Sequence, residues 1–526
     1  MRIAVLTSST AREMIEEVVG ELSDVLVVAL PVHAIGMLRT STIARILERR
    51  REIAEALRDA DIVLVPGSVE GDTRVIEEVV GRPVYKATRS PVLLPAVINH
   101  LRSGGSLSRT EPAEAVIPGT RLSAKLDFEE AFSIGGVKVP LRGPPMVLVS
   151  EVPPYRGIDE ARREAQRYSG DGADIIAVGC ALDEEPGMLA RRVEAALSAG
   201  KPVLAEAPSR AHAKAALEAG ASGVIAAAGD ALEYADLIGA GHVVVVGSRS
   251  LGELRSTIED LRGMGVSKVI ADPSLQAPPL GFLESIRRLV EASSRIEVPI
   301  QFTAANVVDE VEADTHSIHG LLALVAAEAR ASVYYVVEDS YKAYRSTAEA
   351  REAIDLALAA WTLKRSRDLY SRLLVVKQPH PPPKPPKVKA ERVGYVEPIM
   401  DKRGYITIHV DHERGVIVAV YKLYKGGMIA FEGTHPTSIA RALVRAVKLD
   451  PEHAAYLGYE LAKAEIALRL GRSYIQDEPV ITPVWSDGWG LYGSCSSERP
   501  GEGNPGGGAL RSQGERGYSG CDREKG

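Results

Sequence analysis

The amino-acid sequence predicts an α/β protein with three folded regions: an N-terminal doubly wound α/β domain, a central (β/α)8 barrel and a small C-terminal α+β domain. Its 526 residues are too many for one hydrophobic core and fit about three domains of 100–200 residues each. Apolar strand patterns alternate with amphipathic helix patterns through the first two thirds of the chain. A proline-rich stretch at residues 379–387 then separates this part from a shorter region.

Six segments follow from these patterns. We expect an N-terminal α/β domain at 1–120, a connector at 121–145, the barrel at 146–365, a Pro-rich linker at 366–392, the C-terminal domain at 393–483 and a disordered tail at 484–526. The tail is rich in Gly, Ser and Arg and cannot bury a core. The C-terminal domain is predicted to hold strands at 404–410, 415–421 and 427–431 and helices at 436–447 and 452–470.

The N-terminal domain is expected to be an open parallel sheet with helices on its faces. Its strands are predicted at 2–6, 25–30, 62–65 and 83–86, and its helices at 11–22, 41–57, 73–80 and 94–101. In such sheets ligands bind beyond the carboxyl ends of the strands. The loop from Thr7 to Thr10 leads into a helix, so it offers either an N-cap or free backbone N–H groups for an anion. No G-x-G-x-x-G follows the strand, and the N-cap is the commoner use.

Eight further strand–helix units occupy residues 146–365, which is the number that closes a (β/α)8 barrel. The strands are predicted at 146–150, 174–178, 202–206, 223–226, 242–247, 268–271, 299–302 and 333–337. The second lies in Gly172-Ala-Asp-Ile-Ile-Ala-Val-Gly179, an unbroken apolar run of the kind that a parallel sheet covers on both faces. An open eight-stranded sheet is the alternative.

Functional residues of such barrels lie at the carboxyl ends of the strands. Glu206 ends the third strand and Asp272 the sixth, and we expect both carboxylates to face the mouth of the barrel. A carboxylate accepts paired N–H donors, as an aminopyrimidine-like ring presents them. A loop salt bridge or a helix cap is the alternative role for each of them alone.

Composition narrows the class of protein. The 63 basic and 70 acidic residues give a net charge of −7, so the whole chain lacks the basic balance of a nucleic-acid binder. A membrane span needs about 18 consecutive apolar residues, and the sequence has no such window. The N-terminus begins with a strand pattern rather than a signal peptide. The cysteines Cys180, Cys495 and Cys521 lie far apart, which fits a reducing cytoplasm. We expect a cytoplasmic protein that binds neither nucleic acid nor membrane.

Histidines offer a weaker hypothesis. Asp314, His316 and His319 have a spacing that would present three metal ligands on a helical face, but a helix N-cap with solvated histidines explains the same residues. His453 near a helix start is compatible with a corrinoid ligand, and a helix-cap histidine is the commoner case. We therefore assign no metal site.

Several motifs carry a resemblance to a known family. The stretch from Gly172 to Gly179 resembles the second strand of dihydropteroate synthases and of other pterin-binding barrels. The segments at 202–220, 271–273 and 305–314 support the match, and those at 305–314 and 338–342 are most similar to archaeal dihydropteroate synthase-related proteins. So are the N-terminal motifs at 30–33, 65–67 and 70–72 and the C-terminal motif at 450–465. The resemblance covers about residues 1–480.

This resemblance implies a pterin-binding barrel that acts as a transferase in pteridine metabolism. The ligand would be a reduced pterin of the tetrahydrofolate or methanopterin type, in pterin or one-carbon metabolism. The implied ligand-binding residues are Glu206, Asp272, Asn306, Glu338 and Lys342, while no catalytic residue is assigned. A homodimer is compatible with the resemblance.

The chain departs from the synthases at several strand ends. The first strand ends in Ser150-Glu151 where the synthases carry Asn, and the third ends in Glu206-Ala207 where they carry Asp-Thr. The fourth offers only Ala226, Ala227 and Ala228 in place of an Asn. Neither the seventh-strand Lys nor the Arg-x-His after the eighth strand has a clear counterpart.

These departures leave several functions open. A pterin-binding protein with a divergent active site is the leading hypothesis, either synthase-like or similar to pterin-dependent methyltransferases. The first alternative is a non-catalytic scaffold that links the flanking domains. The second is a barrel enzyme that binds a phosphorylated substrate at Gly247-Ser-Arg249.

Overall fold

The computed structural model describes residues 1–20, 22–117, 128–239, 241–366, 369, 371–377, 388–391, 393 and 401–482. The predicted tail at 484–526, most of the Pro-rich linker and the first part of the connector lie outside the described residues. The chain divides into two compact units, Met1–Pro382 and Pro383–Gly526. Among the described helices, none combines the length and hydropathy that a membrane span requires.

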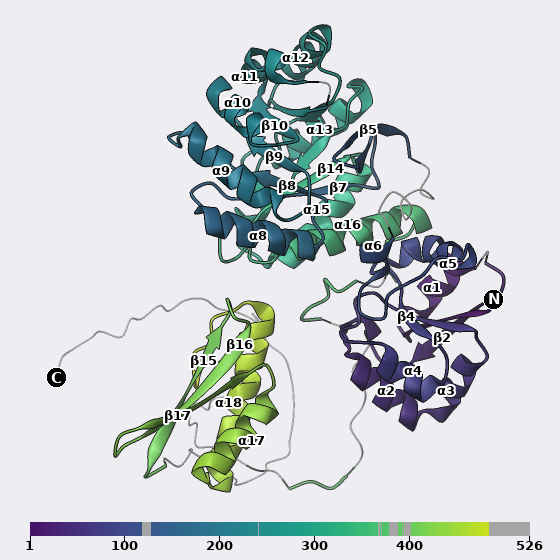
Figure 1. The fold of residues 1–526 in the computed structure, drawn as a ribbon, viewed down its shortest axis with the longest axis vertical. Helices are drawn as coiled ribbons and strands as arrows, with labels where there is room; N and C mark the ends of the chain where they lie inside the picture. The colour runs from purple at the N-terminus through teal and green to yellow at the C-terminus, as the bar shows by residue number, and fades with distance from the viewer. Residues whose placement is uncertain are drawn as a thin grey trace, which may run out of the picture. The chain divides into compact units, whose positions relative to one another are not determined.

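The first unit begins with a four-stranded parallel sheet of order β2-β1-β3-β4. Helices α1 and α5 pack on one face of the sheet, and α2, α3 and α4 pack on the other (Figure 1). The strands are β1 (Ile3–Ser8), β2 (Val25–Leu30), β3 (Ile62–Val65) and β4 (Val84–Lys86). The helices are α1 (Arg12–Val19), η1 (Ile35–Met37), α2 (Thr40–Arg49), α3 (Arg51–Arg58), α4 (Arg74–Val80), η2 (Pro91–Leu93), α5 (Leu94–Arg102) and α6 (Ala113–Val116).

One predicted helix of this domain is wrong in its extent. The pattern at 41–57 predicted a single long helix, but the chain forms two, α2 and α3. They are separated at Arg50, whose ψ of 68° lies outside the helical region. Apolar side chains of both helices still face the sheet, so the amphipathic pattern continued across the break and concealed it.

The predicted barrel is confirmed, and the open sheet is excluded. Eight parallel strands have the order β12-β11-β10-β9-β8-β7-β14-β13. A bridge between Ala271 and Ile300, with the Ala271 N–H donating to the Pro299 carbonyl at 2.9 Å, joins the two end strands and closes the ring. The helices surround the strands (Figure 1). The strands are β7 (Val147–Val152), β8 (Ile175–Val178), β9 (Val203–Glu206), β10 (Gly223–Ala227), β11 (Val243–Gly247), β12 (Val269–Asp272), β13 (Gln301–Thr303) and β14 (Val333–Val337).

The helices of the barrel follow their strands in turn. They are α8 (Ile158–Asp171), α9 (Pro186–Leu197), α10 (Arg210–Glu218), α11 (Ala228–Glu233), η4 (Ala235–Leu237), α12 (Leu251–Gly263), α13 (Phe282–Arg295), α14 (Ala305–Val308), α15 (Thr315–Glu328) and α16 (Ser346–Leu363). Their apolar faces pack against the outward-facing strand residues. The packed residues form two hydrophobic clusters outside the ring of strands, which are its outer layers.

The inner core of the barrel alternates with these outer layers at every second residue, as the pleat of a strand requires. One cluster collects the inward-facing residues, among them Val149, Leu204, Ile270 and Tyr335. Side chains on one face of a strand recur at every second residue. The residues two positions after Val149, Leu204 and Ile270 are Glu151, Glu206 and Asp272, so these carboxylates also face the inside of the barrel. The hydrophobic pattern therefore positions the polar residues of the mouth.

A hairpin closes the amino end of the barrel within the segment predicted as a connector. It consists of β5 (Glu130–Ile134) and β6 (Val137–Pro140). Ile134 and Val139 are fully buried and join the inner cluster of the barrel. The guanidinium of Arg142 donates to the carbonyls of Ser293 at 2.6 Å and Val298 at 2.8 Å, which fixes the end of the hairpin.

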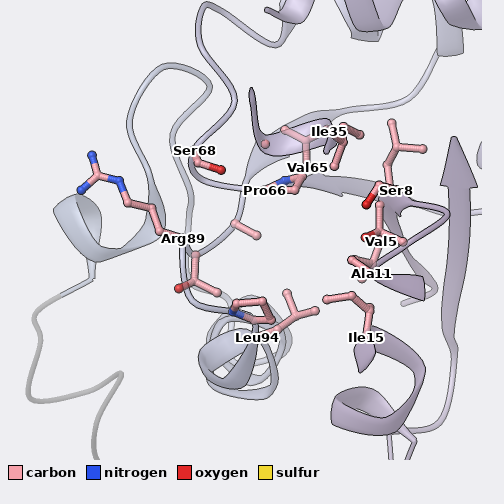
Figure 2. Close-up of a pocket in the computed structure, with 16 residues that line it drawn as sticks. Val5, Ser8, Ala11, Ile15, Ile35, Val65, Pro66, Ser68, Arg89 and Leu94 are labelled. Carbon is pink, nitrogen blue, oxygen red and sulfur yellow. The ribbon is translucent and has the colours of Figure 1, made fainter. Parts of the chain in front are cut away.

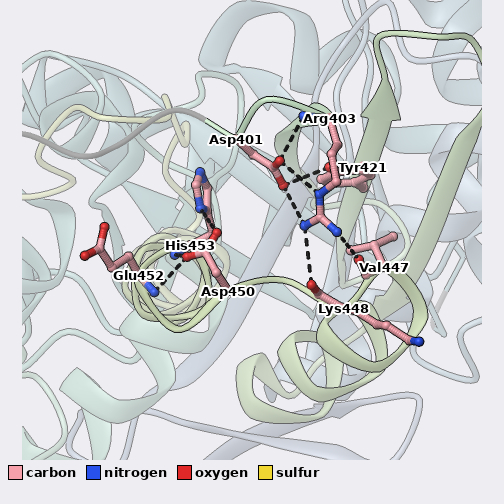
Figure 3. A network of polar contacts seen from close by, with 8 residues as sticks. All are labelled: Asp401, Arg403, Tyr421, Val447, Lys448, Asp450, Glu452 and His453. Atoms are coloured by element: carbon pink, nitrogen blue, oxygen red, sulfur yellow. Dashed lines mark hydrogen bonds and ion pairs between the residues drawn. The ribbon is translucent and has the colours of Figure 1, made fainter.

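The second unit is an antiparallel sheet of order β15-β16-β17 with two helices against one face. Its elements are β15 (Gly404–Asp411), β16 (Val416–Leu423), β17 (Met428–Gly433), α17 (Pro436–Val447) and α18 (Pro451–Leu470). Arg403 ties the sheet to the helices, because it pairs with Asp401 at 3.0 Å and donates to the Val447 carbonyl at 3.0 Å (Figure 3).

We predict that the hairpin contributes to the stability of the barrel. Ile134→Ala removes a buried side chain from the inner core and should lower the free energy of unfolding by about 2–5 kcal/mol. Val137→Ala, at a half-buried position of the same hairpin, should cost less. Urea unfolding of both variants measures the difference, and equal small losses would contradict the role of the hairpin.

Candidate functional site

Three carboxylates lie at inner positions where strands end at the mouth of the barrel. Glu151 lies near the end of β7, Glu206 ends β9 and Asp272 ends β12. Burial raises the pKa of the Tyr335 hydroxyl well above its ordinary value, and the charges of all three carboxylates raise it further. These residues come from four different strands, so barrel closure brings together groups that are distant in sequence.

Glu151 is the most deeply buried of these carboxylates. Its Oε2 accepts a hydrogen bond from the Tyr335 hydroxyl at 2.9 Å. Burial raises the pKa of Glu151 to about 8, and the neighbouring Glu206 adds to the rise. At neutral pH the side chain therefore keeps a proton.

The strand β8 leaves room for this carboxyl group. A Cβ atom built on Gly179, directly after β8, would collide with Oε1 of Glu151 and approach Pro154. The buried guanidinium of Arg192 donates to the Gly179 carbonyl, pairs with Glu184 at 2.6 Å and donates to the Pro153 carbonyl at 3.1 Å. Glycine is thus needed at position 179 so that the Glu151 carboxyl group can lie close to the backbone of the chain after β8.

Glu206 is the second member of the pair. Its Oε2 accepts from the backbone N–H of Cys180 at 3.2 Å. Burial raises the pKa of Glu206, while that hydrogen bond and the charge of Arg192 oppose the rise. Two neighbouring buried carboxyl groups cannot both ionise without a large cost, so the pair holds at least one proton at neutral pH.

Asp272 lies in a network of donors. Its Oδ2 accepts from Thr303 Oγ1 at 2.7 Å and from Gln301 Nε2 at 3.1 Å, and its Oδ1 accepts from the Ser274 N–H at 2.8 Å. Burial raises the pKa of Asp272, and these three hydrogen bonds oppose the rise. The Oε1 atom of Gln301 is buried and has no hydrogen-bond partner among the described residues. The network therefore retains acceptor capacity.

Small residues stand beside Asp272. Gly247 of β11 is in register with Asp272 on one side and with Ala227 of β10 on the other. A Cβ atom on Gly247 would meet nothing closer than the Ala226 carbonyl at 3.8 Å. On the β11 side, the inner surface next to Asp272 is therefore free of side-chain bulk.

The other three sequence-predicted site residues have protein partners. Asn306 donates from Nδ2 to the Leu275 carbonyl at 2.9 Å. Glu338 accepts from Arg167 at 2.7 Å and from the backbone N–H groups of Arg345 and Thr347 at the start of α16. Lys342 donates to the carbonyls of Asp309 at 2.7 Å and Val311 at 2.8 Å. Their contacts join loops and helix ends to one another.

The histidines occupy structural positions. The prediction that His319 is solvated is wrong, because it is buried between Tyr334 and Ser346 at 3.1 Å from each hydroxyl. Burial lowers the pKa of His319 to about 3. His453 Nδ1 lies 2.6 Å from Asp450, the N-cap of α18 (Figure 3). In the described part of the chain, no cluster of three or more His, Cys, Asp or Glu side chains has an arrangement suited to a metal.

Sequence reasoning missed Glu151, Tyr335 and Gln301 as parts of the site. Glu151 was noted only as a departure from the family pattern. Its position two residues after Val149 on the same face was the available signal. Gln301 and Tyr335 could be placed only once the inner face of each strand was known.

Comparisons with known proteins find relatives of the C-terminal domain and of the whole chain. Residues 400–477 match the family model PterinBD-DUF4346. An uncharacterised protein of Methanocaldococcus jannaschii is 26% identical over 527 aligned residues, which cover 91% of this chain and 98% of that protein.

Solved structures of dihydropteroate synthases are also similar. The enzyme of Thermus thermophilus is 21% identical with a TM-score of 0.35, over 44% of this chain and 98% of that one. The Burkholderia cenocepacia enzyme, complexed with 7,8-dihydropteroate, is 19% identical with a TM-score of 0.36, over 44% and 97%.

The family-model match confirms the predicted resemblance to pterin-binding proteins, and the sequence relative extends over almost the whole chain. The barrel itself is established by its strand order and closure.

We predict that the Glu151 proton makes stability depend on pH. Between the ordinary value of 4.5 and the folded value of about 8, the unfolded chain releases this proton while the folded chain keeps it. The free energy of unfolding should therefore fall as pH rises through that window. Glu151→Gln removes this contribution. The variant and the parent chain should therefore unfold at similar temperatures near the lower end of the pH window. Toward the upper end, the variant should unfold at a higher temperature than the parent chain.

Thermal unfolding across this pH window measures the separation. Glu194→Gln, at an exposed position of α9, is the matched control and should follow the parent chain at every pH. A Glu151→Gln curve parallel to that of the parent chain would show that the carboxyl group ionises normally.

Proposed function

We propose that the mouth of the barrel binds a reduced pterin of the tetrahydrofolate or methanopterin type, and that the protein acts in pterin or one-carbon metabolism with a divergent active site. The observation that carries this proposal is Asp272, a buried carboxylate with open space beside it on the inner surface. The 2-amino group and ring N–H of a pterin form a pair of adjacent donors. A carboxylate is the side chain that matches such a pair.

The hydrogen bonds of Asp272 support this role. Oδ1 accepts from the protein only at the Ser274 N–H among the described residues, so it has a further acceptor site for a ligand donor. Thr303 and Gln301 hold Oδ2 and thereby fix the plane of the carboxylate. The partnerless Gln301 Oε1 adds an acceptor near the same group. This preorganisation favours a ligand edge rich in N–H groups.

Whereas Asp272 can only accept hydrogen bonds as a carboxylate, the pair of Glu151 and Glu206 can donate one. A protonated carboxyl group donates one hydrogen bond and accepts others, so the pair can contact a ligand acceptor or transfer a proton to it. Tyr335 fixes the orientation of Glu151. Because this pair replaces the residues that the synthases carry, we assign the chain no synthase reaction. Ring condensation and transfer of a one-carbon group are both chemically compatible with such a proton donor.

One observation favours the alternative of a non-catalytic scaffold. The inner position at the end of β10 is Ala227, which cannot hydrogen-bond a ligand through its side chain, while Ala226 and Ala228 are buried in the outer cluster. A bound pterin would therefore receive no side-chain hydrogen bond from the end of β10. Turnover with any pterin substrate would exclude the scaffold.

We predict that Asp272→Asn weakens pterin binding. The amide keeps the shape of the carboxylate but places one donor where the ligand needs an acceptor, at a cost of about 1–3 kcal/mol, or roughly 5–150-fold in affinity. Calorimetric titration with a tetrahydropterin measures the change. The exposed Asp183→Asn on the loop after β8 is the control. No binding to the parent chain at millimolar pterin, or equal affinities for all three chains, would refute the proposal.

A steric variant tests the same location independently. Gly247→Leu places a side chain in the open space beside Asp272 and should abolish binding while the chain stays folded, because its Cβ meets no close neighbour. Gly263→Leu at the end of α12 also meets no neighbour within 4 Å and should bind normally. Full affinity in Gly247→Leu would place the ligand elsewhere.

A further inference from the structure

Two apolar features lie outside the barrel site: a hollow in the N-terminal domain and a stripe of residues on helix α18. Figure 2 shows the hollow, with Ile35 and Leu94 among the residues around it. The guanidinium of Arg89 points away from the hollow, while its backbone N–H donates to the Glu114 carboxylate at 2.6 Å. The hydroxyl of Thr88 donates to the same carboxylate. These groups are satisfied within the protein, so the hollow gives no indication of a ligand.

The loop beside this hollow differs from its expected role. The N-cap expected between Thr7 and Thr10 is wrong, because the N-cap position of α1 is Ala11, which makes no side-chain capping bond. The hydroxyl of Thr10 instead donates to the His33 carbonyl at 2.5 Å. The loop therefore connects the end of β1 to the segment after β2.

Helix α18 of the C-terminal domain has apolar residues on two sides. On one side, Leu457, Leu461 and Ala464 are fully buried in the core that the helix shares with the sheet and α17. On the other side, Tyr459 is 53% exposed and Ile466 is 42% exposed. A helix that is apolar all round is normally covered all round. The exposed side of α18 therefore has the character of an interface.

The exposed residues of α18 follow the repeat of a coiled-coil seam. Apart from the first and last residues of the helix, the exposed positions are Glu452, Ala455, Tyr459, Ala462, Ile466 and Arg469. The steps between them alternate between three and four residues, which is the a/d spacing of heptads. The exposed positions inside the helix thus belong to one stripe, and a stripe of this kind packs against another helix.

The stripe is complementary to itself when a second copy runs in the opposite direction. In an antiparallel pair, each a position of one helix packs opposite a d position of the other. With the two-fold axis level with the middle of the stripe, Tyr459 lies opposite Ala462, and Ile466 lies opposite Ala455. Each large side chain thus meets a small one, which lets the two helices approach closely.

The charges at the ends of the stripe agree with this register. Glu452 in the first turn lies opposite Arg469 in the last turn. The side chain of Arg469 is 68% exposed and pairs with Glu465 of its own helix at 2.7 Å. Its guanidinium has five donors and can bind a second carboxylate. A parallel pair would instead place like charges against each other at both ends.

A buried network holds α18 in a fixed orientation. Glu460, which is 1% exposed, accepts from Lys463 Nζ at 2.7 Å and from the Tyr474 hydroxyl at 2.6 Å. The same Nζ atom lies 5.3 Å from the centroid of the Tyr459 ring, within the range of a cation–π contact. The stripe therefore has little freedom to lose on association, which lowers the entropic cost of binding.

We propose that the chain forms a homodimer in which the α18 stripe packs antiparallel against the same stripe of a second copy. The partner is a second copy because the stripe matches itself in size and in charge, as a two-fold interface between identical surfaces requires. This interface lies in the C-terminal domain and does not depend on the proposed pterin function.

Sedimentation equilibrium of the full chain tests the proposal. The parent chain should be a dimer, and Ile466→Glu should raise the dimer dissociation constant about 100-fold or more, because it places an unpaired charge in the seam. Tyr405→Glu is the matched control, since Tyr405 is 43% exposed on the face of the sheet that points away from α18. This control should dimerise like the parent chain. A monomeric parent chain, a dimer that survives Ile466→Glu, or loss of the dimer in Tyr405→Glu would overturn the proposal.

Charge reversal tests the antiparallel register. Glu452→Arg alone and Arg469→Glu alone each place like charges at both ends of the pair, and each should weaken dimerisation about tenfold. An equimolar mixture of the two variants restores opposite charges at both ends and should recover the parental affinity within about threefold. This recovery also shows that both variants are folded. Single variants that dimerise as tightly as the parent chain, or a mixture no tighter than its components, would contradict the register.

Discussion

The mouth of the barrel depends on two carboxyl groups that are buried side by side. Glu151 and Glu206 share an environment in which full ionisation of both is costly, and burial is the main cause of both raised pKa values. The surrounding residues can be understood from this constraint. Gly179 has no side chain because Glu151 occupies that space, and Tyr335 supplies a hydrogen bond to its carboxyl group. Arg192 contributes a positive charge that lowers the pKa of Glu206 against the effect of burial.

Both α/β regions of the first unit are built on parallel strands, and the barrel concentrates its polar side chains at their carboxyl ends. The barrel mouth collects carboxylates on side chains that the strand pleat turns inward. Carboxylates accept hydrogen bonds, so a ligand proposed for this mouth is one rich in donors.

The fold was predictable to a large extent because hydrophobic periodicity determines it. The last barrel strand, Val333–Val337, was predicted with its observed bounds, and the other strands of the barrel differ by one or two residues. The break between α2 and α3 was not predictable, because the apolar face continues across it.

The site was predictable only where a residue could be placed by its strand. Glu206 and Asp272 do lie on inner positions at strand ends. The roles predicted for Glu338 and Lys342 could not take account of Arg167 or the Asp309 carbonyl, since these partners are distant in sequence. Glu151 escaped notice for a related reason: its unusual pKa arises from Glu206 and from burial, neither of which a local motif reveals.

The charge of the mouth also bears on the reaction. A phosphorylated substrate needs cations to stabilise the charge of a departing phosphate or diphosphate, and the basic residues in the loop after β14 are already engaged. Arg345 pairs with Asp171 at 2.9 Å, and Lys342 donates to two backbone carbonyls. The mouth instead offers a proton on the Glu151–Glu206 pair. If a bound pterin places a basic ring nitrogen against this pair, transfer of the shared proton to the ring leaves two carboxylates, and the positive charge of the protonated ring offsets their mutual repulsion. Within the proposed function, this electrostatic balance favours chemistry at a protonated ring nitrogen.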